Sequence, residues 1–280
     1  MKQIENNMRR MQVGQCIAAL GLFLSVLLLQ IFSVLIVSIV YSITHNKFVL
    51  ENYVMIVSAL SALFSLAWCG YWYKKSTWRV EHFSYRKAFR GKTVLSIIGL
   101  AVGGCTSLSI ALSILQMLVP QWFVTYQGVM DHFTVSAQGL VYFYVLLLGP
   151  ISEEMIFRGA ILDHFYLAFP FWAANLLQAA LFGVYHGNLI QGLYAFALGL
   201  ALGLIRKSTE TILASMITHI LFNATSYALQ WIFPSGKQYT FYLFIVILCI
   251  AVPCFVYSLW YTIHTTNAVF DGKENGNMKL

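Results

Sequence analysis

The chain has 280 residues, of which 59% are hydrophobic and only 10% are charged. A soluble domain of ordinary composition carries about 25% charged residues, because its surface must face water. The composition therefore excludes an ordinary soluble fold and indicates surroundings that are mostly lipid. The formal net charge of +7 does not indicate nucleic acid as a partner, because the basic residues flank apolar segments, where they act as topology signals.

Apolar runs long enough to cross a bilayer recur along the chain. About 20 apolar residues in a helix cross the roughly 30 Å of hydrocarbon, and backbone groups in lipid must be satisfied within the segment. The first run exceeds the apolar core of a signal peptide, which is about 7 to 15 residues. The sequence therefore predicts an all-α, polytopic transmembrane bundle of about eight spans: 13–43, 52–73, 93–118, 138–162, 169–187, 189–205, 209–231 and 240–263.

The distribution of Lys and Arg predicts that both termini are cytoplasmic. With eight spans, every Lys and Arg except Lys47, Lys237 and Arg158 falls on the side of the amino terminus, and the 119–137 connection contains no Lys or Arg. Cytoplasmic loops carry such an excess of basic residues. The 74–92 connection also mixes cations with aromatic residues. It is either a topology-setting loop or a segment that lies on an anionic leaflet.

Small residues at four-residue spacing predict close contacts between helices, as in Gly99-xxx-Gly103 and Ala195-xxx-Gly199-xxx-Gly203. The odd number of cysteines, and their placement in apolar runs, indicate neither a disulfide framework nor a zinc-ligand spacing. These cysteines are Cys16, Cys69, Cys105, Cys249 and Cys254.

The predicted span 138–162 differs from the others because it carries Glu153, Glu154 and Arg158 within six positions. A charge at a helix centre costs about 2.5 to 3.5 kcal/mol, so the three imply a cost on the order of 8 to 10 kcal/mol that must be compensated. Residues four apart share a helix face, so we expect Glu154 and Arg158 to form an ion pair while Glu153 points elsewhere, toward a substrate or a water. The alternative is an ion pair that only fixes helix packing.

Pro150 precedes these glutamates and lacks a backbone N–H. We therefore expect a break in the helix near the glutamates, where a half-helix amino terminus and some water are available.

Two later spans carry further polar residues. His186 follows Phe182 by one helical turn, so the ring is expected to hold the orientation of the imidazole. His219 and Asn223 are also four apart and share a face. A carboxylate or imidazole that takes a proton from water, together with a histidine and an amide that stabilise an oxyanion, supplies the parts of amide hydrolysis.

Glu153, His186 and His219 would also suit a divalent metal such as zinc with an open coordination position. The spacing does not decide between this site and a site without a cofactor.

The order of the three motifs on successive spans resembles the signature of the CPBP family, also called Abi. This family includes the type II CAAX prenyl endopeptidases and bacterial proteins linked to bacteriocin processing and self-immunity. The motifs are Glu153-Glu154-xxx-Arg158, Phe182-xxx-His186 and His219-xxx-Asn223. The resemblance covers residues 138 to 230, which divides the chain into three regions: N-terminal transmembrane helices with a basic cytoplasmic loop (1–137), a CPBP-like catalytic core (138–230), and a last helix with its tail (231–280).

The resemblance implies a role for each matched residue. Glu153 and His186 would activate the attacking water, whereas His219 and Asn223 would form an oxyanion site. Two further residues, Glu154 and Arg158, would support them. The family has been regarded both as metalloproteases and as metal-independent glutamate peptidases, so the resemblance leaves the metal open.

The resemblance thus predicts a multi-pass intramembrane endopeptidase that hydrolyses a peptide bond in a membrane-embedded peptide or protein, with membrane lipids as its surroundings. In a bacterial plasma membrane, a secreted peptide such as a pheromone or bacteriocin leader is favoured over a prenylated CAAX protein. One alternative is a non-catalytic immunity or scaffold protein that binds a peptide. Another is a proton-coupled transporter, but such carriers usually show related halves, whereas here the polar residues lie in the second half.

Overall fold

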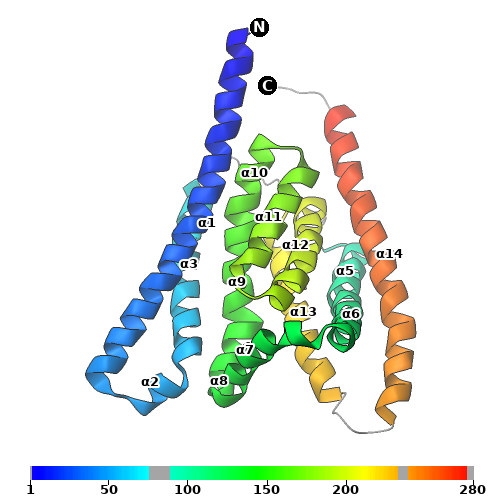
Figure 1. The fold of residues 1–280 in the computed structure, drawn as a ribbon. Helices are drawn as coiled ribbons and strands as arrows, with labels where there is room; N and C mark the ends of the chain where they lie inside the picture. Colours follow the sequence, from blue (N-terminus) through cyan, green and yellow to red (C-terminus); the bar gives the residue numbers. More distant parts are fainter. Residues whose placement is uncertain (1, 76–88, 233–238, 276–280) are drawn as a thin grey trace. The chain divides into compact units, whose positions relative to one another are not determined.

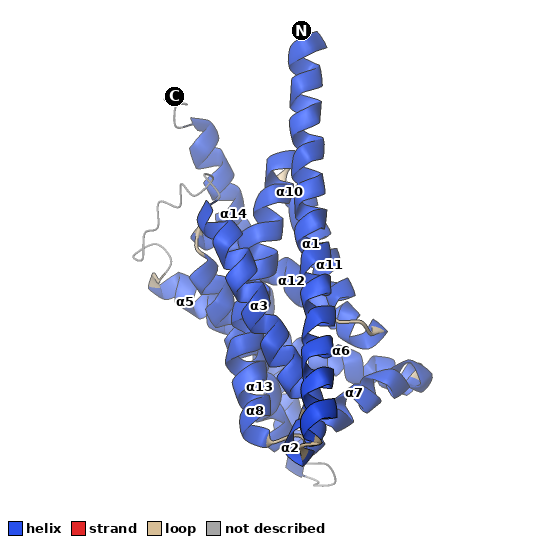
Figure 2. Cartoon of the chain, turned by 90° about the vertical axis from the view of Figure 1, so that its left-hand side faces the viewer, coloured by secondary structure: helices blue, strands red, loops and turns tan. Residues whose placement is uncertain are grey.

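The computed structural model describes residues 2–75, 89–232 and 239–275. Every regular element in these ranges is a helix, which confirms the all-α prediction (Figure 1, Figure 2). The elements are α1 (Lys2–Thr44), α2 (Lys47–Glu51), α3 (Tyr53–Lys75), α5 (Gly91–Ile98), η1 (Gly99–Gly103), α6 (Gly104–Leu118), η2 (Pro120–Phe123), α7 (Val124–Val135), α8 (Gln138–Phe143), η3 (Tyr144–Leu148), α9 (Gly149–Glu154), η4 (Met155–Ile161), α10 (Leu162–Ala168), α11 (Phe171–Tyr185), α12 (Leu189–Thr209), α13 (Ile212–Ile232) and α14 (Tyr239–Asn275).

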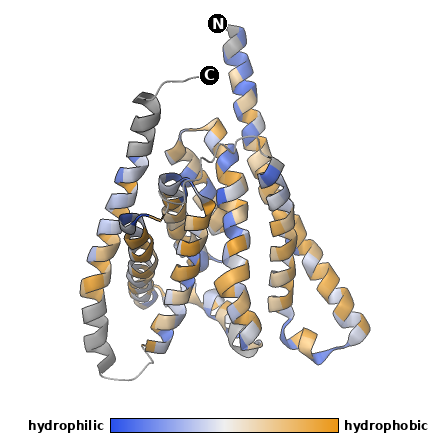
Figure 3. Ribbon diagram, turned by 180° about the vertical axis from the view of Figure 1, so that it is seen from behind, coloured by the Kyte–Doolittle hydropathy of each residue, from blue (hydrophilic) through white to orange (hydrophobic). Residues whose placement is uncertain are grey.

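Seven helices among the described residues are long and apolar enough to cross a membrane, so the chain is a multi-pass membrane protein. They are Glu5–Thr44, Tyr53–Lys74, Gly91–Leu118, Gln138–Ala168, Leu189–Thr209, Ile212–Ile232 and Leu248–Asn267. Figure 3 shows how far hydrophobic residues dominate these helices, and how α1 becomes hydrophilic toward its amino terminus. Of the predicted basic loop 74–92, residues 76–88 lie outside the described residues.

The structure differs from the predicted eight spans at the segment 169–187. This segment forms α11, which has 15 residues. At 1.5 Å per residue its length is about 22 Å, less than the roughly 30 Å of hydrocarbon. Phe169 and Pro170 join it to α10, and α11 folds back against α10 and η4.

The predicted end of the fourth span at residue 162 is also too early. The helix continues to Ala168, although Asp163 and His164 interrupt its apolar pattern. A hydrogen bond of 2.6 Å joins His164 Nδ1 to Gln15 Oε1 of α1. This polar partner on a neighbouring helix satisfies His164 within the helix.

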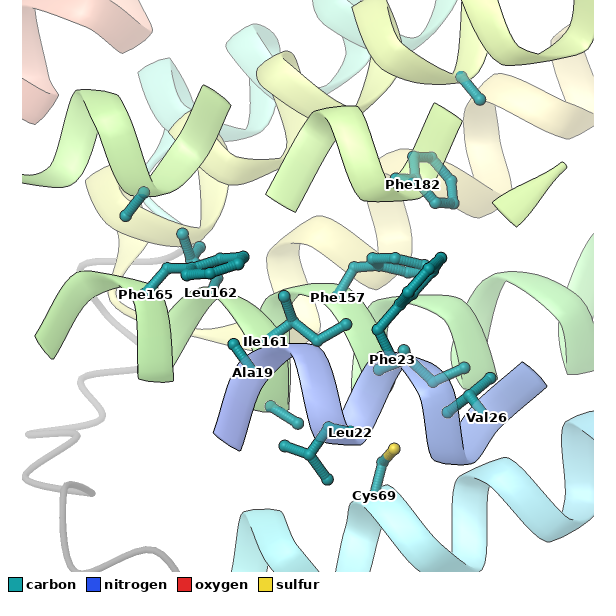
Figure 4. Packing of buried hydrophobic residues seen from close by; sticks show 14 residues of the cluster. Ala19, Leu22, Phe23, Val26, Cys69, Phe157, Ile161, Leu162, Phe165 and Phe182 are labelled. Carbon is teal, nitrogen blue, oxygen red and sulfur yellow. The ribbon is translucent and has the colours of Figure 1, made fainter. Parts of the chain in front are cut away.

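The chain forms two compact units, of which the first comprises Met1–Val80 and Val119–Leu200. In this unit α1 packs along α3, and both contact η4, while α1 also contacts α10. The centre of its apolar core is Phe157, which is fully buried. Figure 4 shows Phe157 with Phe23 of α1 on one side and Phe182 of α11 on the other.

The second unit comprises Glu81–Leu118 and Ala201–Leu280, in which α14 and α13 pack against α5, η1 and α6. Gly103 lies against α14, because a Cβ added there would stand 2.6 Å from the backbone oxygen of Ala251. The predicted close contact at Gly99-xxx-Gly103 is confirmed, since Gly99 also abuts Ser258 of α14. A buried hydrogen bond of 2.8 Å between the hydroxyls of Ser96 and Thr262 joins the same helices.

Candidate active site

The helix that carries the two glutamates is widened on both sides of them. The π-helical segments η3 and η4 flank the single α-helical stretch α9, Gly149–Glu154. The N–H of Gly149 donates to the carbonyl of Tyr144, and the N–H of Leu162 donates to that of Phe157, both five residues back. Such π-bulges occur mostly as single turns and often at functional sites.

The expected break near Pro150 is wrong, because the helix runs without interruption from Gln138 to Ala168. The π-helical turn before Pro150 shifts the hydrogen-bonding register by one residue. This shift accommodates a residue that has no N–H to donate, so no half-helix amino terminus forms.

Glu154 and Arg158 form the predicted ion pair, with 2.7 Å between Arg158 Nη1 and Glu154 Oε1. Neither side chain is exposed. The guanidinium also donates from Nη2 to the carbonyl of Gly199 on α12 at 3.2 Å, and its Cζ lies 4.5 Å from the centroid of the Phe182 ring. A buried charge requires such partners, because desolvation alone costs several kcal/mol per ion.

A buried polar network continues from Arg158 into α11 and α12. Gln178 Nε2 donates to the same Gly199 carbonyl at 2.9 Å and to Asn175 Oδ1 at 2.8 Å. Gly199 lies close to Ala179, because a Cβ added there would meet Ala179 at 3.1 Å. The close packing predicted from Gly199 is thereby confirmed, and it brings the Gly199 carbonyl within reach of the guanidinium.

Glu153 differs from its neighbour because its side chain is partly exposed, whereas Glu154 is fully buried. Its charge acts on Arg158 and on the phenols of Tyr144 and Tyr185. The side chains of adjacent helical residues point about 100° apart, so those of the two glutamates lie in different surroundings. The predicted pairing of Glu154 with Arg158 is confirmed, whereas the direction in which Glu153 points stays a prediction.

His186 lies in the tight turn between α11 and α12. The turn needs Gly187, whose φ of +70° is a left-handed conformation that other residues rarely adopt. Asn188 then begins α12, since its Oδ1 accepts from the N–H of Gln191 at 2.8 Å and its Nδ2 donates to Gln191 Oε1 at 2.7 Å. These two interactions cap the new helix, so the position of His186 is fixed from both sides.

The tautomer of His186 follows from its contact with the backbone. Nδ1 lies 2.8 Å from the carbonyl oxygen of Phe182. A carbonyl can only accept, so Nδ1 carries the proton and donates it, and Nε2 holds the lone pair of the neutral ring. This is the nitrogen that would serve as a base or metal ligand.

Aromatic rings join the Glu153 helix to His186. The ring of Phe157 lies 4.9 Å from that of Phe182 and 5.5 Å from that of Tyr185, measured between centroids. The rings of Phe182 and His186 are 4.9 Å apart at an interplanar angle of 82°. The predicted orientation of the imidazole by Phe182 is confirmed, and Phe157 connects this ring to the acidic helix (Figure 4).

His219 and Asn223 lie in the second unit, one helical turn apart on α13. His219 is buried, whereas Asn223 is partly exposed. The structure therefore brings Glu153, Glu154, Arg158 and His186 together in the first unit and places the other two on a shared face of α13. Convergence of the two sets on one site stays a prediction.

Within the described ranges, neither unit by itself gathers three His, Cys, Asp or Glu side chains that would hold a metal ion. A catalytic zinc site usually has three protein ligands, so such a site would need His219 beside Glu153 and His186.

Tyr144 and Tyr185 are two residues of the site that the sequence does not predict. Tyrosine is common in membrane helices, so its occurrence alone singles out no position. The adjacency of Tyr185 to His186 is a signal, and the spacing of Tyr144 to Glu153 becomes informative only with the π-helical register.

Fold and site together define a multi-pass helical membrane protein with an acidic residue, a buried ion pair and an oriented histidine in its helical interior. Residues 136–225 match the family model described as type II CAAX prenyl endopeptidase Rce1-like, so this region of the chain is similar to that protease family. All six predicted site residues lie inside the match.

One curated protein is also similar to part of the chain. The chain is 29% identical over 97 residues to a Bacillus subtilis (strain 168) protein named "Putative membrane peptidase YdiL". The aligned stretch covers 35% of this chain and 39% of that relative. No solved structure matches the chain.

Proposed function

We propose that this protein is an intramembrane endopeptidase that hydrolyses a peptide bond in a membrane-associated peptide or protein. The observation that carries the proposal is the division of labour on one helix: Glu154 and Arg158 neutralise each other in full burial, while Glu153 is partly exposed. An ion pair that served packing alone would not require a second carboxylate beside it. The family match supports the reaction class.

The proposed mechanism uses a water held by Glu153 and His186. Transfer of a water proton to one of these bases frees a hydroxide to attack the carbonyl carbon of the scissile bond. His219 and Asn223 would donate hydrogen bonds to the resulting oxyanion. Collapse of the tetrahedral intermediate breaks the C–N bond, and the proton held by the base passes to the leaving amine.

We further propose that both termini lie in the cytoplasm. The asymmetry of Lys and Arg supports this topology. In a bacterial plasma membrane, the substrate class that we favour is a secreted peptide or its leader.

Purified protein in lipid nanodiscs, incubated with candidate membrane peptides and analysed by mass spectrometry, tests the reaction. Removal of a general base lowers rates by about 10²- to 10⁴-fold, so we expect Glu153→Gln and His186→Ala to lose product to this extent. Glu51→Gln, at an exposed glutamate of α2, is the matched control and should keep wild-type activity. Parallel reactions with a chelator report metal dependence.

Product formation that persists in Glu153→Gln would remove the assignment of this residue. Equal binding of a peptide by wild-type protein and Glu153→Gln, without cleavage by either, would instead support the non-catalytic immunity or scaffold function.

A further inference from the structure

Two tyrosines connect the surroundings of Glu153 to the amino-terminal helices. Tyr144 shares a side-chain hydrogen bond with Ser58 of α3, and Tyr185 shares one with Gln30 of α1. The charge of Glu153 acts on both phenols. Both phenols thus lie within electrostatic range of Glu153, and each is held by a polar side chain from a different helix.

The π-helical turn between Tyr144 and Glu153 places the two residues on the same face of the helix. In this turn the residue five positions on, Gly149, lies on the face of Tyr144, and Glu153 follows four positions later on the same face. A Cβ added at Gly149 would lie 3.5 Å from Tyr144 Cζ. The phenol ring thus lies across the glycine, where a larger residue would compete with it for space.

Tyr185 lies at the end of α11, directly before His186. Its ring stands edge-on to that of Phe157 at 5.5 Å and to that of His186 at 5.9 Å. Movement of this phenol would therefore disturb both the helix of Glu153 and the imidazole that the proposed reaction uses.

Buried hydroxyls need partners, because an unsatisfied one costs about 1 to 3 kcal/mol. Ser58 and Gln30 meet this need for the phenols, and both residues lie outside the family match of residues 136–225. Their helices also pack directly on the acidic helix, α3 on α9 and η4 and α1 on η4. The amino-terminal helices are thus linked to the site through polar groups as well as through apolar packing.

We propose that Tyr144 and Tyr185 are positioning residues that orient the Glu153 carboxylate, and that Ser58 and Gln30 of the amino-terminal helices hold the two phenols in place. The inference rests on the proposed function, in which the orientation of Glu153 toward water decides the rate. A charged acceptor in a dry site responds to small displacements, because effective catalysis requires reacting groups within a few tenths of an ångström of their productive geometry.

Removal of each phenol oxygen tests the proposal. In nanodiscs, Tyr144→Phe and Tyr185→Phe should each lower kcat by about 10- to 100-fold while KM stays within about twofold of wild type. Tyr53→Phe is the matched control, because Tyr53 also bridges α1 and α3, with its hydroxyl 2.7 Å from Ser38 Oγ and donating to the carbonyl of Val34 at 3.3 Å. This variant should keep wild-type kcat.

Double substitutions test whether the partners act through the phenols. Gln30→Leu should lower kcat as much as Tyr185→Phe, and the double variant should lose no more than either single variant, because the two changes remove one interaction. Ser58→Ala should match Tyr144→Phe, whereas Ser58→Thr, which keeps the hydroxyl, should retain activity. Additive losses, or equal losses in Ser58→Ala and Ser58→Thr, would overturn the proposed linkage.

The outcomes separate this inference from the proposed function. Activity that survives in Glu153→Gln refutes the proposed function itself. If Glu153→Gln is inactive but Tyr144→Phe and Tyr185→Phe each keep the kcat of Tyr53→Phe, the inference alone is overturned. Unfolding midpoints identify any variant that fails to fold, and if Tyr144→Phe is among these, the comparison of Ser58→Ala with Ser58→Thr decides the role of Tyr144.

Discussion

Replacement of Arg158 by Met is expected to destabilise the protein strongly, because it removes the guanidinium whose Nη1 lies 2.7 Å from Oε1 of the fully buried Glu154. Met fills a similar volume but offers no positive charge or N–H. Truncating one member of a buried pair costs about 3 to 5 kcal/mol, whereas replacing both members by apolar residues is often neutral. The contact between the guanidinium and the Phe182 ring, with 4.5 Å from Cζ to the ring centroid, is by itself worth about 2 kcal/mol when desolvated.

These contributions share one side chain and are not additive, so we expect Arg158→Met to lower the free energy of unfolding by about 3 to 5 kcal/mol. The double variant Arg158→Met/Glu154→Leu should recover most of this loss. Arg9→Met is the matched control, because Arg9 and Glu5 are also four residues apart, with 3.2 Å between Arg9 Nη2 and Glu5 Oε1. Their side chains, however, are 75% and 60% exposed. Exposed pairs of this spacing contribute about 0.3 to 0.5 kcal/mol.

Equilibrium unfolding in mixed micelles with increasing SDS, followed by tryptophan fluorescence, measures the three variants. A loss in Arg158→Met no larger than that in Arg9→Met would refute the energetic importance of the buried pair. A double variant as unstable as the single one would show that the cost comes from packing and not from the loss of the positive charge opposite Glu154.

Other substitutions test the packing and the oxyanion residues. Phe182→Ala should lower the free energy of unfolding by about 3 to 5 kcal/mol, as large-to-small core changes do. It should also lower kcat, because the Phe182 ring orients His186. Unchanged stability in the same SDS titration would contradict the first expectation. Gly183→Ala should cost about 1 to 3 kcal/mol, since its Cβ would stand 2.8 Å from a backbone oxygen of α12, whereas Gly128→Ala, with nothing within 4 Å, should cost nothing. Asn223→Ala should lower kcat by about 10²- to 10³-fold with little change in KM, and a full-rate variant in the peptide assay would exclude an oxyanion role.

The features that the sequence predicts well are those decided by local spacing. Hydrophobic length sets where helices form, and the four-residue interval between Glu154 and Arg158 places their side chains together whatever the rest of the bundle does. Phe182 and His186 follow the same rule on α11. The family resemblance rests on these intervals as well, and the family model matches residues 136–225 where the motifs indicate 138–230.

The features that escape the sequence depend on backbone register or on distant partners. In a π-helical turn each N–H bonds to the carbonyl five residues back instead of four, and the sequence periodicity does not predict where this occurs. Pro150 therefore indicates a break in the helix that does not form. The helix runs past its predicted end at residue 162, where His164 forms a hydrogen bond with Gln15, a residue distant in the sequence. The tyrosines beside Glu153 become visible only with their partners on α1 and α3.

The packing of Phe157 has a consequence for protein engineering. The residues that complete its apolar surroundings include Phe23, whose ring lies 6.4 Å away on α1, and Cys69 of α3. The segment 136–225 thus does not enclose its own interior. A chimera that transplants this segment into another membrane scaffold must also supply a two-helix hairpin of matching shape. Copying the motif residues alone transfers the reactive groups without the neighbouring helices that pack against them.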